Sequence, residues 1–170
     1  MKLSYIAAAV LAASSFHGIA AADTDLGLLN PSASFSSTVT GAFTHIYSFN
    51  FATPSIVAAS ATNVEITFGS TSIGGIEDFA ATLNGVNLNL SSFTSSAPPV
   101  SVTTQVLAGS TTLPAGMYQL IVSGSGVTGS SASYGGNIVA TPVPEPETYA
   151  MLLAGLGVVG FLSARRRNQS

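Results

Sequence analysis

IEDFAATLNGVNLNL, residues 76–90, carries the clearest indication of the fold. Asn84 and Gly85 are a preferred pair for a two-residue type I′ turn, because both central positions of that turn need positive φ. In that register Leu83 lies opposite Val86 on one side of the ribbon. The apolar face predicted for this ribbon holds Phe79, Ala81, Leu83, Val86, Leu88 and Leu90, whereas Asn87 and Asn89 face water. Turn chemistry and hydrophobic pattern agree, so the sequence predicts a β-hairpin.

The same period-2 alternation occurs in two stretches before the hairpin. FTHIYSFNF, residues 43–51, places four aromatic side chains and His45 on one face. NVEITF, residues 63–68, predicts Val64, Ile66 and Phe68 facing inward, with Asn63, Glu65 and Thr67 facing outward.

Further strands are predicted after the hairpin, at VSVTTQVLA (100–108) and GMYQLIVSGSG (116–126). SYGGNIVA (133–140) is predicted as an edge or bulged strand, because glycines weaken the interior of a strand. Residues 93–100 and 124–132 are predicted as loops. Short strands separated by turn residues predict an all-β fold, a single antiparallel β-sandwich or jelly-roll-like domain.

The residue pattern at the amino end is typical of a targeting segment. Lys2 precedes an apolar run from Leu3 to Phe16 and the small residues Ala20-Ala21-Ala22. This order predicts a helical secretory signal peptide over residues 1–22, with Ala20 and Ala22 marking the cleavage site. A membrane anchor is the alternative, but the run is shorter than the ~20 residues that a span needs.

The expected β-sandwich domain, residues 23–141, is unusual in its charge. Its charged residues are all acidic: Asp23, Asp25, Glu65, Glu77 and Asp78. A nucleic-acid partner is therefore excluded, because phosphate binding needs basic side chains. Cysteine is absent, which removes disulfides and thiolate metal sites.

The carboxy end, residues 142–170, collects the remaining positive charge. Pro142, Pro144 and Pro146 predict an extended, non-helical strip that holds Glu145 outward. The uncharged run from Tyr149 to Ala164 predicts a short transmembrane helix of about 24 Å, slightly less than the ~30 Å hydrocarbon core. The cluster of arginines predicted to stop this helix on the cytoplasmic side consists of Arg165, Arg166 and Arg167.

VPEPETYAMLLAGLGVVGFLSARRR resembles the PEP-CTERM sorting signal of Gram-negative bacteria, with the Pro144-Glu145-Pro146 motif, the apolar helix and the arginine cluster in order. An ordinary tail anchor with a proline-rich stalk is the alternative. The resemblance implies recognition by exosortase, a membrane transpeptidase, and removal of the tail. Proteins of this kind are associated with exopolysaccharide and with biofilm or floc formation.

The middle of the chain is similar to the FxDxF group of PEP-CTERM proteins. The late GxYxLxVxG strand of that group is matched by Gly116, Tyr118, Leu120, Val122 and Gly124. In the early strand Phe43 matches, but His45 stands where the group has Asp and Tyr47 where it has Phe. The role of the group's Asp is therefore not transferred to His45.

Few residues are candidates for chemistry. His45 lacks a second His or Cys as a metal partner and is expected to be packed. Glu77 and Asp78 are adjacent, so on a strand they point to opposite faces and cannot form a glycosidase pair by themselves. Two alternatives stay open: calcium at Asp23 and Asp25 with Asn30, and a sugar-stacking strip formed by Tyr47, Tyr118 and Tyr134.

The sequence thus predicts an exported, non-enzymatic protein with no catalytic residue, metal or cofactor. It is expected to cross the inner membrane, to be held there transiently by its carboxy-terminal helix, and to reach the outer surface or the extracellular matrix. Its expected role is structural or adhesive in exopolysaccharide or biofilm. The alternative is a carbohydrate-binding module that recognises the exopolysaccharide of the host. An envelope hydrolase would require a carboxylate pair or triad that the sequence does not assemble.

Overall fold

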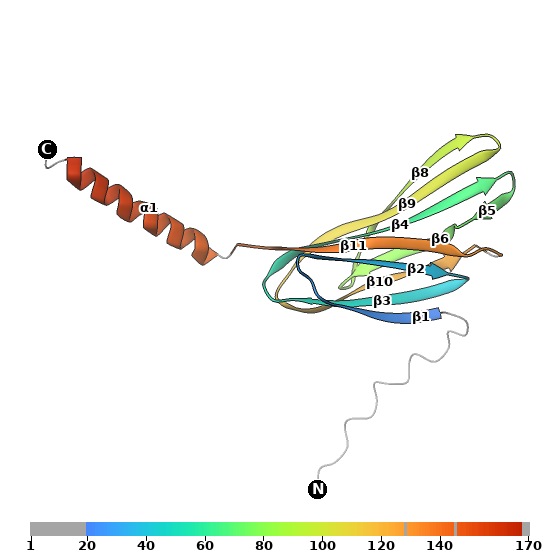
Figure 1. The fold of residues 1–170 in the computed structure, drawn as a ribbon, viewed down its shortest axis with the longest axis horizontal. Helices are drawn as coiled ribbons and strands as arrows, with labels where there is room; N and C mark the ends of the chain where they lie inside the picture. The colour runs from blue at the N-terminus through green and yellow to red at the C-terminus, as the bar shows by residue number, and fades with distance from the viewer. Residues whose placement is uncertain (1–19, 128, 145, 168–170) are drawn as a thin grey trace, which may run out of the picture.

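The computed structural model describes residues 20–127, 129–144 and 146–167. In these residues the chain forms two β-sheets followed by one helix (Figure 1). The five-stranded sheet contains, in spatial order, β1 (Ala20–Leu28), β3 (Ala42–Phe51), β10 (Gly116–Gly126), β6 (Ile76–Leu83) and β7 (Val86–Asn87). The six-stranded sheet contains β2 (Ser32–Val39), β11 (Ala132–Pro142), β4 (Ser55–Phe68), β9 (Val100–Leu113) and β8 (Asn89–Ala97), with β5 (Thr71–Ile73) beside β4. The helix is α1 (Pro146–Arg167).

The two sheets enclose one apolar core, which confirms the predicted two-sheet β-fold. Alternation in β3 is as predicted, because all five residues of its inward face are buried, including Phe49 at 1% exposure. Leu120 and Ile138 reach 0% exposure from the central strands β10 and β11. One pair of strands departs from the expected antiparallel arrangement. β1 and β3 are parallel, because β2 between them belongs to the other sheet.

The predicted turn at Asn84-Gly85 is confirmed, although the apolar face is shorter than expected. Both residues have positive φ, 49° and 79°, and Leu83 pairs with Val86. However, β7 contains only two residues, and the chain then crosses to β8 in the other sheet. The prediction of one continuous face is therefore wrong at Val86 and Leu90, which are 51% and 49% exposed.

β11 is not the edge strand that its glycines predicted. It pairs along its length with β2 on one side and β4 on the other. A Cβ atom at Gly136 would lie 2.0 Å from the Ser60 carbonyl oxygen and 2.5 Å from Cζ of Phe35. Position 136 therefore needs a glycine because neighbouring atoms approach its backbone closely. Close approach, as well as an edge or a bulge, explains a glycine inside a strand.

The inward and outward faces of residues 63–68 are the reverse of those predicted. Asn63 is 1% exposed, whereas Val64, Ile66 and Phe68 are 45%, 46% and 58% exposed. The buried face of β4 consists of Ser55, Val57, Ala59, Ala61 and Asn63. Alternation runs through the strand without a bulge, so apolar residues change sides after Ala61. The prediction was wrong because alternation identifies the apolar face of a strand, but not whether another sheet covers that face.

The predicted loop at 93–100 is mostly strand. Residues 93–97 belong to β8 and pair with β9, which leaves Pro98 and Pro99 in the connection. Together with the distal halves of β4 and β9 and with β5, β8 forms an arm, defined here as residues 64–73 and 89–106. The arm diverges from the five-stranded sheet and extends to the right in Figure 1. Residues 89–99 are accordingly all exposed.

Candidate functional site

The carboxy-terminal segment leaves the sandwich from a central strand. Thr141 and Pro142 still pair with Ile56 and Ser55 of β4. The Val143 N–H then donates a hydrogen bond to the Pro54 carbonyl at 2.9 Å. This bond fixes the start of the link, the proline-rich segment between β11 and α1. Sequence reasoning missed this anchoring contact, because it depends on a distant loop.

The helix begins earlier than the sequence analysis placed it. Pro146 is its first residue, so the expected non-helical strip is confined to the few residues before it. Proline is favoured at the first helical position, where its missing N–H is not needed. Glu147 lies in the first turn, where a carboxylate interacts favourably with the helix dipole. These two signals could have located the start of the helix. Glu145 lies outside the described residues.

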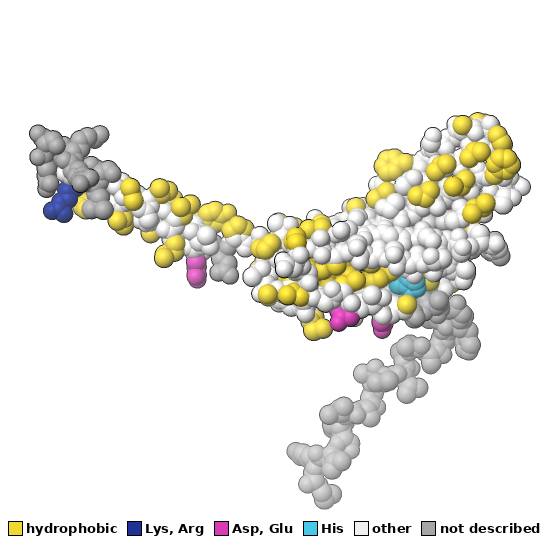
Figure 2. All heavy atoms as spheres, in the orientation of Figure 1, with side chains coloured by type: hydrophobic (Ala, Val, Ile, Leu, Met, Phe, Trp, Pro, Cys, Tyr) yellow, Lys and Arg dark blue, Asp and Glu magenta, His cyan; other side chains and the backbone are white. Residues whose placement is uncertain are grey.

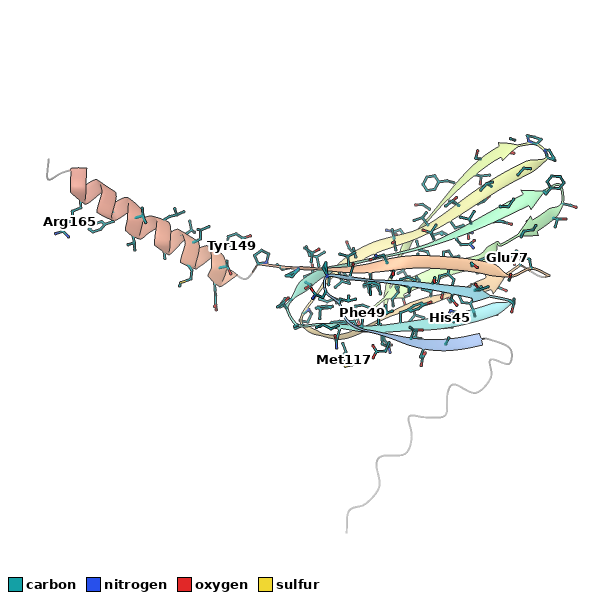
Figure 3. All side chains as sticks on the ribbon, viewed as in Figure 1. His45, Phe49, Glu77, Met117, Tyr149 and Arg165 are labelled. Carbon is teal, nitrogen blue, oxygen red and sulfur yellow. The ribbon has the colours of Figure 1, made fainter. Side chains whose placement is uncertain are left out.

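α1 projects away from the sandwich with apolar side chains on all sides. Tyr149 and Arg165 mark its two ends (Figure 3), and hydrophobic side chains cover the length between them (Figure 2). At ~1.5 Å per residue, the helix is about 33 Å long. The exposed large apolar side chains of α1 are Tyr149, Met151, Leu152, Leu153, Leu156, Val158, Val159 and Phe161. Arg165 is exposed at the carboxyl end, where a cation suits the helix dipole; Arg166 and Arg167 are also helical.

No helix within residues 20–127, 129–144 and 146–167 has both the length and the apolarity needed to cross a membrane. The expected transmembrane character of α1 is therefore not shown.

The predicted signal-cleavage residues lie at the start of the first strand. The backbone of residues 20–22 belongs to β1 and pairs with residues 43–45 of β3. Cleavage after Ala22 would shorten β1 to residues 23–28. The apolar run before it lies outside the described residues.

His45 is packed inside the sandwich, as expected (Figure 3). Its Nδ1 atom forms a hydrogen bond of 2.7 Å with the Tyr134 hydroxyl, which forms another of 2.8 Å with the Tyr47 hydroxyl. The Phe43 ring lies against both His45 and Tyr134, at centroid distances of 5.1 and 5.4 Å. Burial lowers the pKa of His45, because a charged imidazole loses its hydration there. Burial likewise raises the pKa of both tyrosines. The cluster is a structural polar network that joins the two sheets.

The lowered pKa of His45 predicts a loss of stability in mild acid. The unfolded chain takes up a proton near the ordinary pKa of 6.5, whereas the folded chain resists protonation. The contribution of neutral His45 to the free energy of unfolding is therefore fully present above that pH and is lost as the pH drops below it. We expect the urea midpoint to decrease between about pH 7.5 and pH 5.5, and the slope to flatten in His45→Gln. Equal slopes for both proteins over this range would contradict the assignment.

The acidic candidates are not brought together. Glu77 and Asp78 are exposed on β6 at a bulge opposite β10, where Asp78 adopts a positive φ of 51°. Glu65 lies on β4 in the other sheet. The Asp25 carboxylate accepts a hydrogen bond from the Gly27 N–H at 2.8 Å, and Asp23 is exposed. Within the described ranges, no group of three or more His, Cys, Asp or Glu side chains could hold a metal ion.

The proposed tyrosine strip is not present on the surface. Tyr47 and Tyr134 are each 3% exposed and belong to the core. Tyr118 is partly exposed and stacks on Phe51 at a centroid distance of 5.1 Å. It borders a shallow hollow of about 300 Å³, whose lining includes Ser48, Asn84 and Gln119. Alternation could not separate buried from exposed tyrosines, because it does not say which face a second sheet covers.

The sequence predicts that Asn63 faces outward, but its side chain is buried and connects three segments by hydrogen bonds. Its side-chain amide donates to the carbonyl oxygens of Gly74 and Ser133, at 2.8 and 2.9 Å. It thereby joins β4, the end of the arm and β11. The available signal was that Asn63 continues the alternating row of small apolar residues Val57, Ala59 and Ala61.

The fold and the carboxy-terminal segment together define a class of protein. It is a two-sheet β-protein that carries an exposed apolar helix after a proline-rich link. Residues 142–167 match the PEP-CTERM protein-sorting motif. The chain therefore carries a PEP-CTERM sorting motif at its carboxy end, as the sequence predicted.

Among solved structures, the chain is similar to the pre-peptidase C-terminal domain of a collagenase from Bacillus anthracis. The two share 17% identity, with a TM-score of 0.41, over 68% of this chain and 93% of that chain. No curated protein matches the chain.

Proposed function

We infer that the protein is an exported substrate of exosortase that acts as a structural or adhesive component of exopolysaccharide or biofilm. The observation that carries this proposal is the PEP-CTERM motif at residues 142–167, on a segment accessible for processing. The link follows directly from β11, and the described large apolar side chains of α1 are exposed. A membrane enzyme could therefore bind this segment without unfolding the sandwich.

Processing would proceed in a fixed order. The apolar helix holds the chain transiently at the inner membrane, with the arginine cluster on the cytoplasmic side. Exosortase then recognises Pro144-Glu145-Pro146 and removes the tail, which releases the sandwich to the outer surface or the matrix. The role of the sandwich in this proposal is non-enzymatic.

The test compares two neighbouring carboxylates in a host that contains exosortase. Glu145→Ala should reduce release of the protein at least about tenfold, because it removes a contact expected to act in the transition state. Glu147→Ala is the matched control, since Glu147 lies two residues away and outside the Pro144-Glu145-Pro146 tripeptide, and it should be released normally. Intact-mass measurement should show Arg165 to Arg167 retained in the first variant and absent in the control. Equal release and equal mass would contradict exosortase processing.

A carbohydrate-binding module is the second candidate, and the hollow beside Tyr118 favours it. The polar residues Ser48, Asn84 and Gln119 line this hollow, and a few polar groups of this kind fix the orientation of a ligand in a binding site. A binding isotherm on the purified polysaccharide of the host separates the two candidates. Saturable binding that Gln119→Ala abolishes would favour the module, whereas its absence would favour the structural role.

A further inference from the structure

The arm has an apolar face on the side that points away from the core. On β4 the buried side chains occupy positions 57, 59 and 61, but the large apolar ones then occupy 64, 66 and 68. The same change occurs on β9, where Leu107 and Leu113 are buried and the apolar residues of the arm are Val100, Val102 and Val106. Because the two strands pair without a bulge from Ser55 to Phe68, the apolar residues have moved to the opposite face.

Strand register places these side chains next to one another. Ile66 pairs with Ile73 on one side and Val102 on the other, so the three form a row across β5, β4 and β9. Thr104 pairs with both Val64 and Phe93, which extends the face to β8. The outer arm face is defined here by Val64, Ile66, Phe68, Ile73, Phe93 and Val102. Five of these side chains are between 45% and 64% exposed, and Figure 2 shows hydrophobic side chains gathered on the arm.

The opposite face of the arm is polar. The hydroxyls of Thr94 and Thr103 form a hydrogen bond of 3.0 Å, and those of Thr67 and Ser72 one of 3.3 Å. The only charged residue in segments 64–73 and 89–106 is Glu65, which shares this polar face with Thr67 and Thr103. An exposed, contiguous apolar surface next to a solvated polar one marks an interaction site.

We propose that the outer arm face packs against the same face of a second copy of this chain. An uncharged apolar sheet face can pack against an identical face, and two sheets pack face to face about 10 Å apart. A two-fold axis would then bring identical residues into an isologous contact. The chain's own α1 does not fill this place, because it leaves the opposite end of the sandwich (Figure 1).

The area of the face indicates a weak dimer. Four strands ~4.8 Å apart, with an average of about six arm residues of ~3.4 Å each, give a footprint of roughly 390 Å² per copy. Two copies therefore cover about 780 Å², which is below the ~1,200 Å² of a stable specific interface and in the range of weak, transient contacts. Self-association should accordingly occur in the micromolar range.

Sedimentation velocity from about 1 to 200 μM tests the proposal, with every variant made in the full 170-residue chain. The wild-type chain should shift from monomer to dimer across this range. Ile66→Lys should weaken the dimer at least about 100-fold, because each copy would bury an unpaired charge. Ile56→Lys is the matched control. It changes the same residue type on the same face of the same strand, with 47% exposure against 46%, but outside the arm.

Two further variants distinguish other modes of association. Ser92→Lys places a charge on the polar face of the edge strand β8 and would block pairing of strand edges. Leu156→Lys would disrupt contacts between α1 helices. Both should dimerise like the wild type. The proposal is overturned if the wild type stays monomeric, if Ile66→Lys and Ile56→Lys behave alike, or if only Ser92→Lys or Leu156→Lys dissociates the dimer. Circular dichroism confirms that each variant is folded.

Discussion

Gly136→Ala is expected to destabilise the sandwich by about 3 kcal/mol or more, a large part of the ~5–15 kcal/mol typical of a domain. The added methyl group would lie 2.0 Å from the Ser60 carbonyl oxygen and 3.0 Å from Cα of Ala61. Both are backbone atoms of β4, which is held by β9 on its other side. Neither can move without breaking the ladder between β4 and β11.

The neighbouring glycine provides the control. A Cβ atom at Gly135 would have its nearest contact at 3.4 Å, an ordinary van der Waals distance. Gly135→Ala should therefore change stability by less than about 1 kcal/mol, because it adds no clash. Urea unfolding followed by circular dichroism measures both variants. Similar midpoints for Gly136→Ala and Gly135→Ala would show that the close approach of β4 and β11 is wrong.

Tyr134→Phe is expected to cost about 2–4 kcal/mol, although it removes a single oxygen atom. That hydroxyl is the shared hydrogen-bond partner of His45 and Tyr47. Its removal leaves two buried polar groups unpaired, whereas a phenylalanine ring would keep the contacts with Phe35, Phe43 and Phe79. The loss should therefore come from the polar network rather than from packing.

Tyr118→Phe is the matched control for this substitution. The Tyr118 hydroxyl donates to the Pro114 carbonyl at 2.9 Å in an exposed setting, where water can replace the lost partner. Its removal should cost no more than about 1 kcal/mol. Denaturant midpoints of the two variants provide the comparison. A loss for Tyr134→Phe as small as for Tyr118→Phe would mean that the buried network does not support the core.

Sequence reasoning succeeded where the decisive interactions are local. The turn at Asn84-Gly85 depends on the backbone preferences of two residues, and its register was correct. The predicted buried face of β3 was also correct, because a row of aromatic side chains on one face is strongly stabilised by burial in the core. Most directly, the sorting segment was identified from contiguous residues, and the family match covers the same part of the chain. The helix begins at Pro146 rather than at Tyr149, because proline is compatible with the first position of a helix.

Only the tertiary structure decided which face of a strand is covered. Alternation separates the two faces of a strand, but burial depends on whether a second sheet lies against one of them. Val64, Ile66 and Phe68 therefore had the right spacing and the wrong environment, since the five-stranded sheet does not extend over the arm. The central place of β11 and the meeting of His45 with Tyr134 likewise depend on segments about ninety residues apart. By itself the sequence determined where strands, turn and sorting tail lie, whereas the pairing of distant strands decided what is buried and what is left exposed for a partner.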